Sequence, residues 1–153
     1  MKNLTTGIIL IAILLFFCTC KKDSTPTPTV TPLTKTQILA KYNWKIDETF
    51  YNINGNVTHY KRGGVNTTGA NYDIVRFTFK ADGTGTDTDG NGIVHTLTWN
   101  FSGSDEGTMQ LAISGTPVIN ATWSLVAITE AGLFQTNATV AGTLETAKLI
   151  PDK

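Results

Sequence analysis

Hydrophobic and polar residues alternate along most of the chain after residue 43, which is the pattern of β-strands that bury one face. The clearest run is IVHTLTWNF (93–101), whose odd-numbered positions are apolar or aromatic apart from one histidine. A second run, VRFTFK (75–80), places Phe77 and Phe79 on one face and polar residues on the other. The two runs predict a sheet with a large apolar face and a threonine-rich face in contact with water.

Segments rich in glycine, asparagine and aspartate separate these runs and predict tight turns between consecutive strands. The predicted strands cover residues 44–52, 56–62, 72–80, 84–88, 92–102, 107–114, 118–129, 133–141 and 143–150. The dipeptides that favour tight hairpins are Asn54-Gly55, Asp82-Gly83, Asp89-Gly90 and Asn91-Gly92. Consecutive hairpins without a helical crossover predict an antiparallel meander, so the expected fold class is all-β.

A short helix is predicted ahead of the first strand. Thr34 and Gln37 have the spacing of a capping box. Ile38, Leu39 and Tyr42 then form an apolar stripe at helical spacing. Residues 34–153 are therefore expected to fold as one domain that begins with this helix.

About eight strands of this kind must either close on themselves or pack as two sheets. Closure produces an up-and-down β-barrel, in which each strand pairs with the next along the chain. A β-sandwich instead requires Greek-key crossovers between the sheets. The short predicted loops favour consecutive pairing over crossovers.

Residues 1–19 have the parts of a secretory signal peptide. Residues 8–17 are apolar, and Cys18 and Cys20 follow. The apolar run is shorter than the roughly 20 residues that a transmembrane helix needs. The segment resembles a bacterial lipoprotein signal, in which cleavage precedes a cysteine that is then acylated. Cys20 is the predicted lipidation site, because small Thr19 precedes it; the alternative is an ordinary cleaved signal that leaves Cys20 as a free thiol.

Cleavage and acylation at this position leave no free thiol, which excludes disulfides, thiol nucleophiles and cysteine metal sites. Residues 20–33 contain Pro26, Pro28 and Pro32 among threonines, and this composition predicts an extended tether. The expected location is the bacterial outer membrane, at the cell surface or on the periplasmic face. The membrane is then the first predicted partner, bound through the acyl chains.

Four features of the folded part together resemble the lipocalin-like lipoproteins of Bacteroidota. They are Trp44 at the start of the first strand, FTFKADGTGT (77–86), LTWNF (97–101) and ATWSLVAIT (121–129). The resemblance covers roughly residues 39–150. It implies a small up-and-down barrel, closed at its base by the N-terminal helix, with a cup for a small apolar or amphipathic ligand.

Six side chains are the predicted lining of such a cup. They are Phe77, Phe79, His95, Leu97, Trp99 and Trp123. A small eight-stranded barrel can instead fill completely with side chains, and these residues are then core. In that alternative the protein is a non-enzymatic interaction or structural module of the envelope, which binds a protein partner through its outer face and loops.

Other patterns disfavour nucleic acids, metals and catalysis. The chain has 12 basic and 12 acidic residues and no basic stripe, so nucleic acid is not an expected partner. DTDGNGIVHTLT (87–98) matches part of a calcium loop, but Thr98 stands where a glutamate is needed, so a hairpin is predicted. His59 and His95 fall on different strands, and no metal site, cofactor or catalytic motif is predicted. The protein is expected not to be an enzyme.

Residues 61–71, KRGGVNTTGAN, form a long polar loop between two predicted strands. Loops at the mouth of a barrel can gate or contact a ligand. The composition favours the simpler interpretation of a solvated loop.

Overall fold

The helix and the strands lie close to where the residue pattern predicts them. The computed structural model describes residues 31–138 and 143–153. The elements are α1 (Lys35–Lys41), β1 (Asn43–Ile53), β2 (Asn56–Lys61), β3 (Arg76–Phe79), β4 (Thr84–Thr88), β5 (Val94–Ser102), β6 (Thr108–Ile113), β7 (Ile119–Thr129), β8 (Gly132–Ala138) and β9 (Thr143–Pro151). Within the described ranges, no helix has the length and apolar character needed to cross a membrane.

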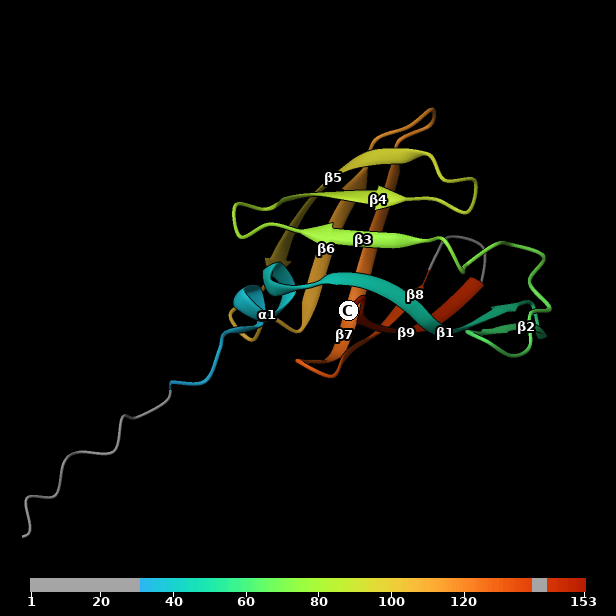
Figure 1. Ribbon diagram of the computed structural model, residues 1–153, viewed down its shortest axis with the longest axis horizontal. Coiled ribbons are helices and arrows are strands. Elements are labelled where there is room, and N and C mark those ends of the chain that lie inside the picture. The colour runs from blue at the N-terminus through green and yellow to red at the C-terminus, as the bar shows by residue number, and fades with distance from the viewer. Residues whose placement is uncertain (1–30, 139–142) are drawn as a thin grey trace, which may run out of the picture. The chain divides into compact units, whose positions relative to one another are not determined.

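Eight of the strands close an antiparallel barrel (Figure 1). From β3 to β9 each strand pairs with the next along the chain, and β1 closes the barrel by pairing with both β3 and β9. The predicted all-β, up-and-down barrel with a short N-terminal helix is confirmed. The β-sandwich alternative is wrong, because the sheet closes on itself without Greek-key crossovers.

β2 departs from the simple meander, because it pairs with β1 but not with β3. Both strands use the same edge of β1: Glu48 is opposite Lys61 of β2, and Lys45 is opposite Arg76 of β3. β2 and β3 are thus two halves of one strand, interrupted by residues 62–75. The predicted strand 72–80 is correspondingly shorter, because its first four residues belong to this interruption.

α1 begins at the predicted capping box. The Thr34 hydroxyl accepts a hydrogen bond from the Gln37 backbone N–H, and the Gln37 side chain accepts one from the Thr34 backbone N–H. The helix buries Ile38 and Leu39 against the barrel. The indole Nε1 of Trp44 donates a hydrogen bond of 3.0 Å to the Leu39 carbonyl oxygen, which joins the helix to the first strand.

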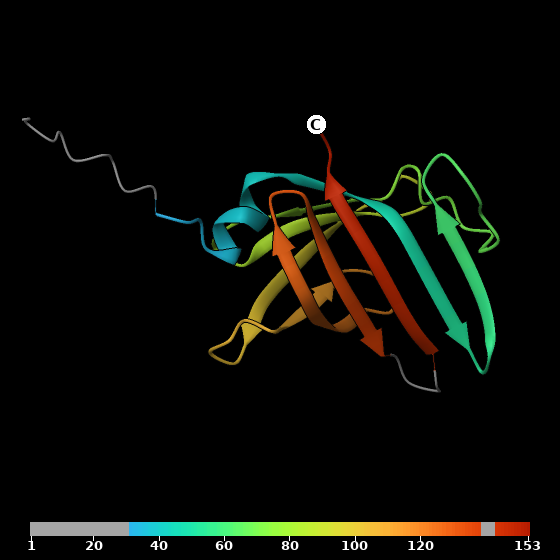
Figure 2. The same ribbon diagram turned by 90° about the horizontal axis from the view of Figure 1, so that it is seen from below.

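The two ends of the barrel differ (Figures 1 and 2). At one end, Lys35 Nζ donates hydrogen bonds to the carbonyl oxygens of Asp105 (3.0 Å) and Glu106 (2.8 Å) in the β5–β6 turn. Lys41 forms an ion pair with Glu130 in the β7–β8 turn. We call this the α1 end. The opposite end carries the turns from β1 to β2, from β4 to β5 and from β6 to β7.

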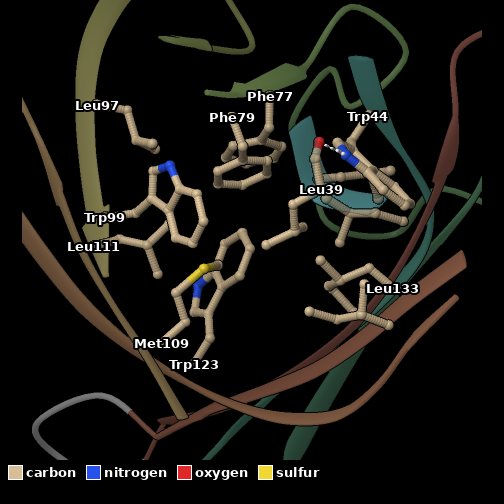
Figure 3. Close-up of a cluster of buried hydrophobic side chains, with 14 of the residues drawn as sticks. Leu39, Trp44, Phe77, Phe79, Leu97, Trp99, Met109, Leu111, Trp123 and Leu133 are labelled. Atoms are coloured by element: carbon tan, nitrogen blue, oxygen red, sulfur yellow. Dashed lines mark hydrogen bonds between the residues drawn. The ribbon is translucent and has the colours of Figure 1, made fainter. Parts of the chain in front are cut away.

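Buried hydrophobic side chains gather inside the barrel as one cluster (Figure 3). The ring of Phe79 meets that of Trp99 edge to face, with centroids 5.7 Å apart. Phe77 and Trp123 meet in the same way at 5.5 Å. Such edge-to-face pairs contribute about 0.5–1.5 kcal/mol each beyond the burial of their area. Large aromatic rings from β3, β5 and β7 therefore fill much of this interior.

Candidate functional site

The six predicted lining residues all lie on inward faces of the barrel strands. Five of them are at most 8% exposed and belong to the hydrophobic cluster (Figure 3): Phe77, Phe79, Leu97, Trp99 and Trp123. His95 is separate, because it lies toward the opposite end and its side chain is 25% exposed. The structure thus brings five residues together as packed core and leaves the sixth in polar surroundings. Their contact with a ligand stays a prediction.

His95 lies among acidic side chains of the β4–β5 hairpin. It is the register partner of Asp87, and its Nε2 lies 3.3 Å from Asp89 Oδ2. Asp89 Oδ1 accepts hydrogen bonds from the backbone N–H groups of Asn91 (2.8 Å) and Ile93 (2.9 Å), as in an Asx-turn. The predicted hairpin is confirmed. In the described part of the chain, no group of three His, Cys, Asp or Glu side chains is placed to hold a metal ion.

Asp87 is a buried carboxyl on the inward face of β4, at 9% exposure. Burial raises the pKa of Asp87 from 3.8 to about 6; His95 opposes this rise and Asp89 adds to it. The folded state therefore holds the Asp87 proton more tightly than the unfolded state does. Ionisation of this carboxyl consequently destabilises the fold.

Asp87→Asn is expected to make the protein more stable than wild type above about pH 6 and equally stable below pH 3.8. Between these values, the free energy of unfolding of the wild type falls relative to the variant as pH rises, because the folded protein must release the tightly held proton. Thermal unfolding of both proteins across this range measures the difference.

The matched control is Asp82→Asn in the β3–β4 turn. Hydrogen bonds from Thr84 lower the pKa of the exposed Asp82 carboxyl, so its ionised form is the one that the fold stabilises. Asp82→Asn is therefore expected to be less stable than wild type. This difference in the free energy of unfolding is expected to grow as pH rises. Parallel stability profiles for wild type and Asp87→Asn contradict the assignment of Asp87.

A second inward-facing carboxyl, Glu145, is half-buried and is absent from the sequence-based prediction. It lies in a cross-strand row formed by Tyr51, Glu145, Asn137 and Trp123 on β1, β9, β8 and β7. The Tyr51 hydroxyl donates a hydrogen bond of 2.9 Å to Glu145 Oε1. Burial raises the pKa of Glu145, although hydrogen bonds from Tyr51, Asn137 and Thr49 oppose the rise. The row therefore places a partly desolvated carboxyl between Tyr51 and Asn137, with Trp123 on the far side of Asn137.

The alternation of residues along β9 indicates that Glu145 faces the interior of the barrel. In TLETAKLI (143–150), Glu145 has the same parity as Ala147 and Leu149. Both of these neighbours are buried. Because side chains two apart on a strand share a face, a glutamate in phase with them must point into the barrel.

The adjacent row toward the α1 end consists of Thr49, Ala147 and Gln135. Gln135 is 3% exposed, and its Oε1 has no hydrogen-bond partner among the residues that the structure describes. Thr49 Oγ1 lies 3.5 Å from Glu145 Oε1, so the two rows are in contact. A buried amide oxygen without a partner costs about 1–3 kcal/mol.

The loop between β2 and β3 adds one more hydroxyl to these rows. Tyr72 Oη donates a hydrogen bond of 2.9 Å to Tyr51 Oη. We call the resulting set the polar cluster. Its members are Thr49, Tyr51, Tyr72, Gln135, Asn137 and Glu145. The interpretation as a solvated loop fits residues 63–67, which are exposed, whereas the C-terminal part of the loop reaches the polar cluster.

Arg62 holds this loop against the barrel. Its guanidinium donates hydrogen bonds to three backbone carbonyl oxygens, those of Ile46 (2.7 Å), Tyr72 (3.0 Å) and Asp73 (3.0 Å). The Arg62 side chain therefore connects the start of the loop to its C-terminal part and to strand β1. Tyr72 reaches the polar cluster because the loop is fixed in this way.

Arg62→Ala is expected to release the loop. Loss of hydrogen bonds from a charged donor costs about 1.5–3 kcal/mol, and the amides of residues 63–75 are expected to exchange hydrogen faster while those of β5 and β6 are unchanged. Hydrogen exchange resolved by peptide measures both regions. Lys80→Ala, at an exposed turn position, is the control. Unchanged exchange in residues 63–75 contradicts the role of Arg62.

The outer face of the barrel carries a groove across β1, β9 and β8. It has a volume of about 300 Å³, and its walls include Phe50 and Phe134, which are 40% and 43% exposed. The Phe50 ring stacks on His59 with centroids 4.1 Å apart, and Lys148 Nζ lies 5.8 Å from the centre of the Phe134 ring. Phe50 and Phe134 point outward, away from the polar cluster, although the inward-facing Gln135 and Ala147 also line the groove.

No protein-family model, no curated protein and no solved structure matches this chain. The resemblance to lipocalin-like lipoproteins therefore stays a prediction from the sequence.

Proposed function

We propose that this protein is a lipid-anchored lipoprotein of the bacterial envelope whose barrel binds a small amphipathic molecule. The observation that carries the proposal is the polar cluster inside the barrel. Glu145 is half-buried there and its pKa is raised by desolvation, and the Gln135 amide oxygen has no partner among the described residues. The ligand-binding region is the interior toward the opposite end, away from α1.

Stability alone does not account for these buried polar groups. Apolar side chains of similar volume commonly stabilise a core as well as, or better than, a buried charged group. A carboxyl whose pKa is shifted by desolvation in a protein interior is a candidate functional group. A few polar groups beside an apolar wall form the arrangement that orients a small ligand. Ligand binding therefore gives the polar cluster a role that packing does not.

Two of the predicted aromatic lining residues lie on the side of the polar cluster, and His95 lies toward the same end of the barrel. Trp123 lies in the same cross-strand row as Asn137 and Glu145, and Phe77 contacts the Trp123 ring. Phe79 lies farther along its strand toward the α1 end. We assign ligand contact to Phe77 and Trp123, which provide an apolar surface for the body of the ligand, and assign a supporting role in the core to the deeper residues.

The anchoring part of the proposal rests on the N-terminal sequence. Cys20 follows a short apolar run and precedes a tether rich in proline and threonine, and residues 1–30 lie outside the described residues. Each buried methylene of an acyl chain contributes about 0.8 kcal/mol, so more than one chain holds a protein stably on a membrane. The proposed location is the outer membrane, on its surface or periplasmic face.

Native mass spectrometry of the full chain, extracted from membranes in a mild detergent, tests both parts. A bound ligand is expected as one extra mass that disappears on denaturation. Acyl chains are expected as extra mass that survives denaturation and is lost in Cys20→Ser. A ligand-free mass that persists after incubation with fatty acids, alkyl amines and sterols contradicts the carrier function.

The outer groove supports a second candidate function, that of an interaction module of the envelope. Phe50 and Phe134 are large, exposed and adjacent to one groove, and exposed apolar surface is typical of protein contact sites. Phe134→Ser is expected to abolish partner capture under this function and to leave the ligand mass unchanged. The same variant therefore separates the two candidates.

A further inference from the structure

We infer that the ligand presents a positively charged, hydrogen-bond-donating group, such as a protonated amine, to Glu145 and Gln135 inside the barrel. This inference rests on the proposed ligand-binding function and specifies the chemistry of the ligand's polar end. Three observations carry it: the direction of the hydrogen bonds around Glu145, the absence of a cationic partner for Glu145 among the described residues, and the free acceptor on Gln135.

The hydrogen bonds around Glu145 all point toward its carboxylate. Tyr51 donates to Oε1 at 2.9 Å, and Thr49 Oγ1 lies 3.5 Å from the same oxygen. Tyr72 in turn donates to Tyr51, which leaves the Tyr51 proton directed at Glu145. Asn137, the register partner of Glu145 on β8, lies beside the same carboxylate. The cluster is therefore arranged to stabilise an acceptor of hydrogen bonds.

Glu145 has no cationic partner in the part of the chain that the structure describes. The ion pairs of the described residues involve other carboxylates, on outer faces and turns. The titratable groups that face Glu145 are the phenols of Tyr51 and Tyr72, which are neutral donors. A half-buried carboxylate without a cation gains more from a cationic ligand than a fully solvated one does, because charge interactions strengthen away from water.

Gln135 supplies a second acceptor next to this carboxylate. Its Oε1 is buried and unpartnered within the described residues. Gln135 lies two positions before Asn137 on β8, and Asn137 is the register partner of Glu145. Side chains at such diagonal positions on one face lie roughly 7–8 Å apart at their Cα atoms, within reach of long side chains. A primary ammonium group has three N–H donors, which suits a site with acceptors on two neighbouring rows.

An anionic ligand does not fit the same arrangement. A carboxylate or phosphate placed here faces Glu145. The hydroxyl donors of the polar cluster are also already used, because Tyr51 donates to Glu145 and Tyr72 donates to Tyr51. Two like charges in a desolvated site repel strongly. The interior toward the opposite end also contains Asp87, a second carboxyl. The interior therefore selects against negative charge at the polar end of the ligand.

Isothermal titration of the full chain in detergent with three matched probes tests this inference. The probes are 4-phenylbutylamine, 4-phenylbutanol and 4-phenylbutyrate, which share one apolar body, and empty micelles provide the blank. The amine is expected to bind at least about ten-fold more tightly than the alcohol, since a charge-assisted hydrogen bond exceeds a neutral one by this order. The carboxylate is expected to bind most weakly.

Four variants identify the residues responsible. Glu145→Gln is expected to reduce the ratio of the affinities for the amine and the alcohol to within about three-fold. Glu145→Asp is expected to retain the preference for the amine, because the negative charge is kept. Gln135→Met is expected to weaken binding of the amine, but the amine is still expected to bind more tightly than the alcohol. Glu48→Gln is the matched control, because Glu48 lies on the outer face of β1, where it contacts His59 at 3.0 Å. This control is expected to bind as wild type does.

The outcomes separate the inference from the proposed function. Equal or tighter binding of the carboxylate, or an amine preference that survives Glu145→Gln, overturns the inference while the carrier function stands. If none of the probes binds and native mass spectrometry shows no adduct, both fail. Loss of the amine preference in Glu145→Gln, with retention in Glu145→Asp and Glu48→Gln, supports the inference and is not expected of a carboxyl that serves only the fold.

Discussion

Gly85→Ala is expected to lower the free energy of unfolding by about 3 kcal/mol or more and to disrupt the pairing of β3 with β4. A Cβ atom built at Gly85 lies 2.0 Å from the carbonyl oxygen of Thr78 and 3.1 Å from Leu97 Cδ2. The first of these atoms belongs to the backbone of the neighbouring strand, so relief requires that two strands move apart. Overpacking of this kind cannot be relieved by a change of rotamer.

The local hydrogen bonds explain why the strands approach so closely here. The Thr86 backbone N–H donates to the Thr78 hydroxyl at 2.9 Å, and the two threonine hydroxyls are 2.7 Å apart. The Thr78 side chain thus takes part in the hydrogen bonding between β3 and β4 beside Gly85. Glycine in a strand often marks such a close approach or a bend of the barrel wall.

Chemical denaturation of Gly85→Ala beside Gly64→Ala measures the effect. Gly64 has no neighbour closer than 3.6 Å to the position of an added Cβ, so its variant is expected to change stability by less than about 0.5 kcal/mol. Equal stability of the two variants is evidence against close contact between β3 and β4. Amide exchange in β4 and β5 provides a second measure, because these strands are expected to lose protection in Gly85→Ala alone.

Trp44→Ala is expected to destabilise the protein by about 3–5 kcal/mol, the range found for removal of large buried aromatic side chains. Trp44 is fully buried, its ring meets Tyr42 edge to face at 5.9 Å, and its Nε1 donates to the Leu39 carbonyl oxygen. The change removes packing between α1 and the barrel and leaves a helix carbonyl without its donor. The α1 end is therefore expected to open first.

Two further variants separate packing from hydrogen bonding. Trp44→Phe keeps an aromatic ring but removes the N–H donor, so a smaller loss of about 1–3 kcal/mol is expected. Phe50→Ala removes an aromatic residue that is 40% exposed on the outer face, and a loss within about 1 kcal/mol is expected. Denaturant titrations that rank Phe50→Ala equal to Trp44→Ala contradict the role of Trp44 as the link between helix and barrel.

Several features of the fold could be predicted from the sequence because they depend on neighbours in the chain. The capping box of Thr34 and Gln37 is such a case, since both partners lie within one helical turn. The inward direction of Leu97 and Trp99 follows from strand parity in the same way, and both are buried. Local spacing determines these features, so no knowledge of distant contacts is needed.

The candidate site could be predicted only in part. The aromatic residues of β3, β5 and β7 were expected inside the barrel, and Phe77, Phe79 and Trp99 are buried there. Parity also indicates that Glu145 faces inward, but it does not show which residues surround that carboxyl. The partners Tyr51 and Tyr72 come from a distant strand and a loop, and only the barrel register brings them together.

The sequence alone therefore determined the all-β class, the helix at residue 34 and the inward-facing aromatic residues, because alternation and capping depend on residues a few positions apart. Only the tertiary structure decided that β2 and β3 form two halves of one interrupted strand on β1, and that Glu145 and Gln135 lie in neighbouring rows. The physical reason is that closure of a barrel sets the pairing and stagger of strands far apart in the chain, and alternation within each strand is the same for many such pairings.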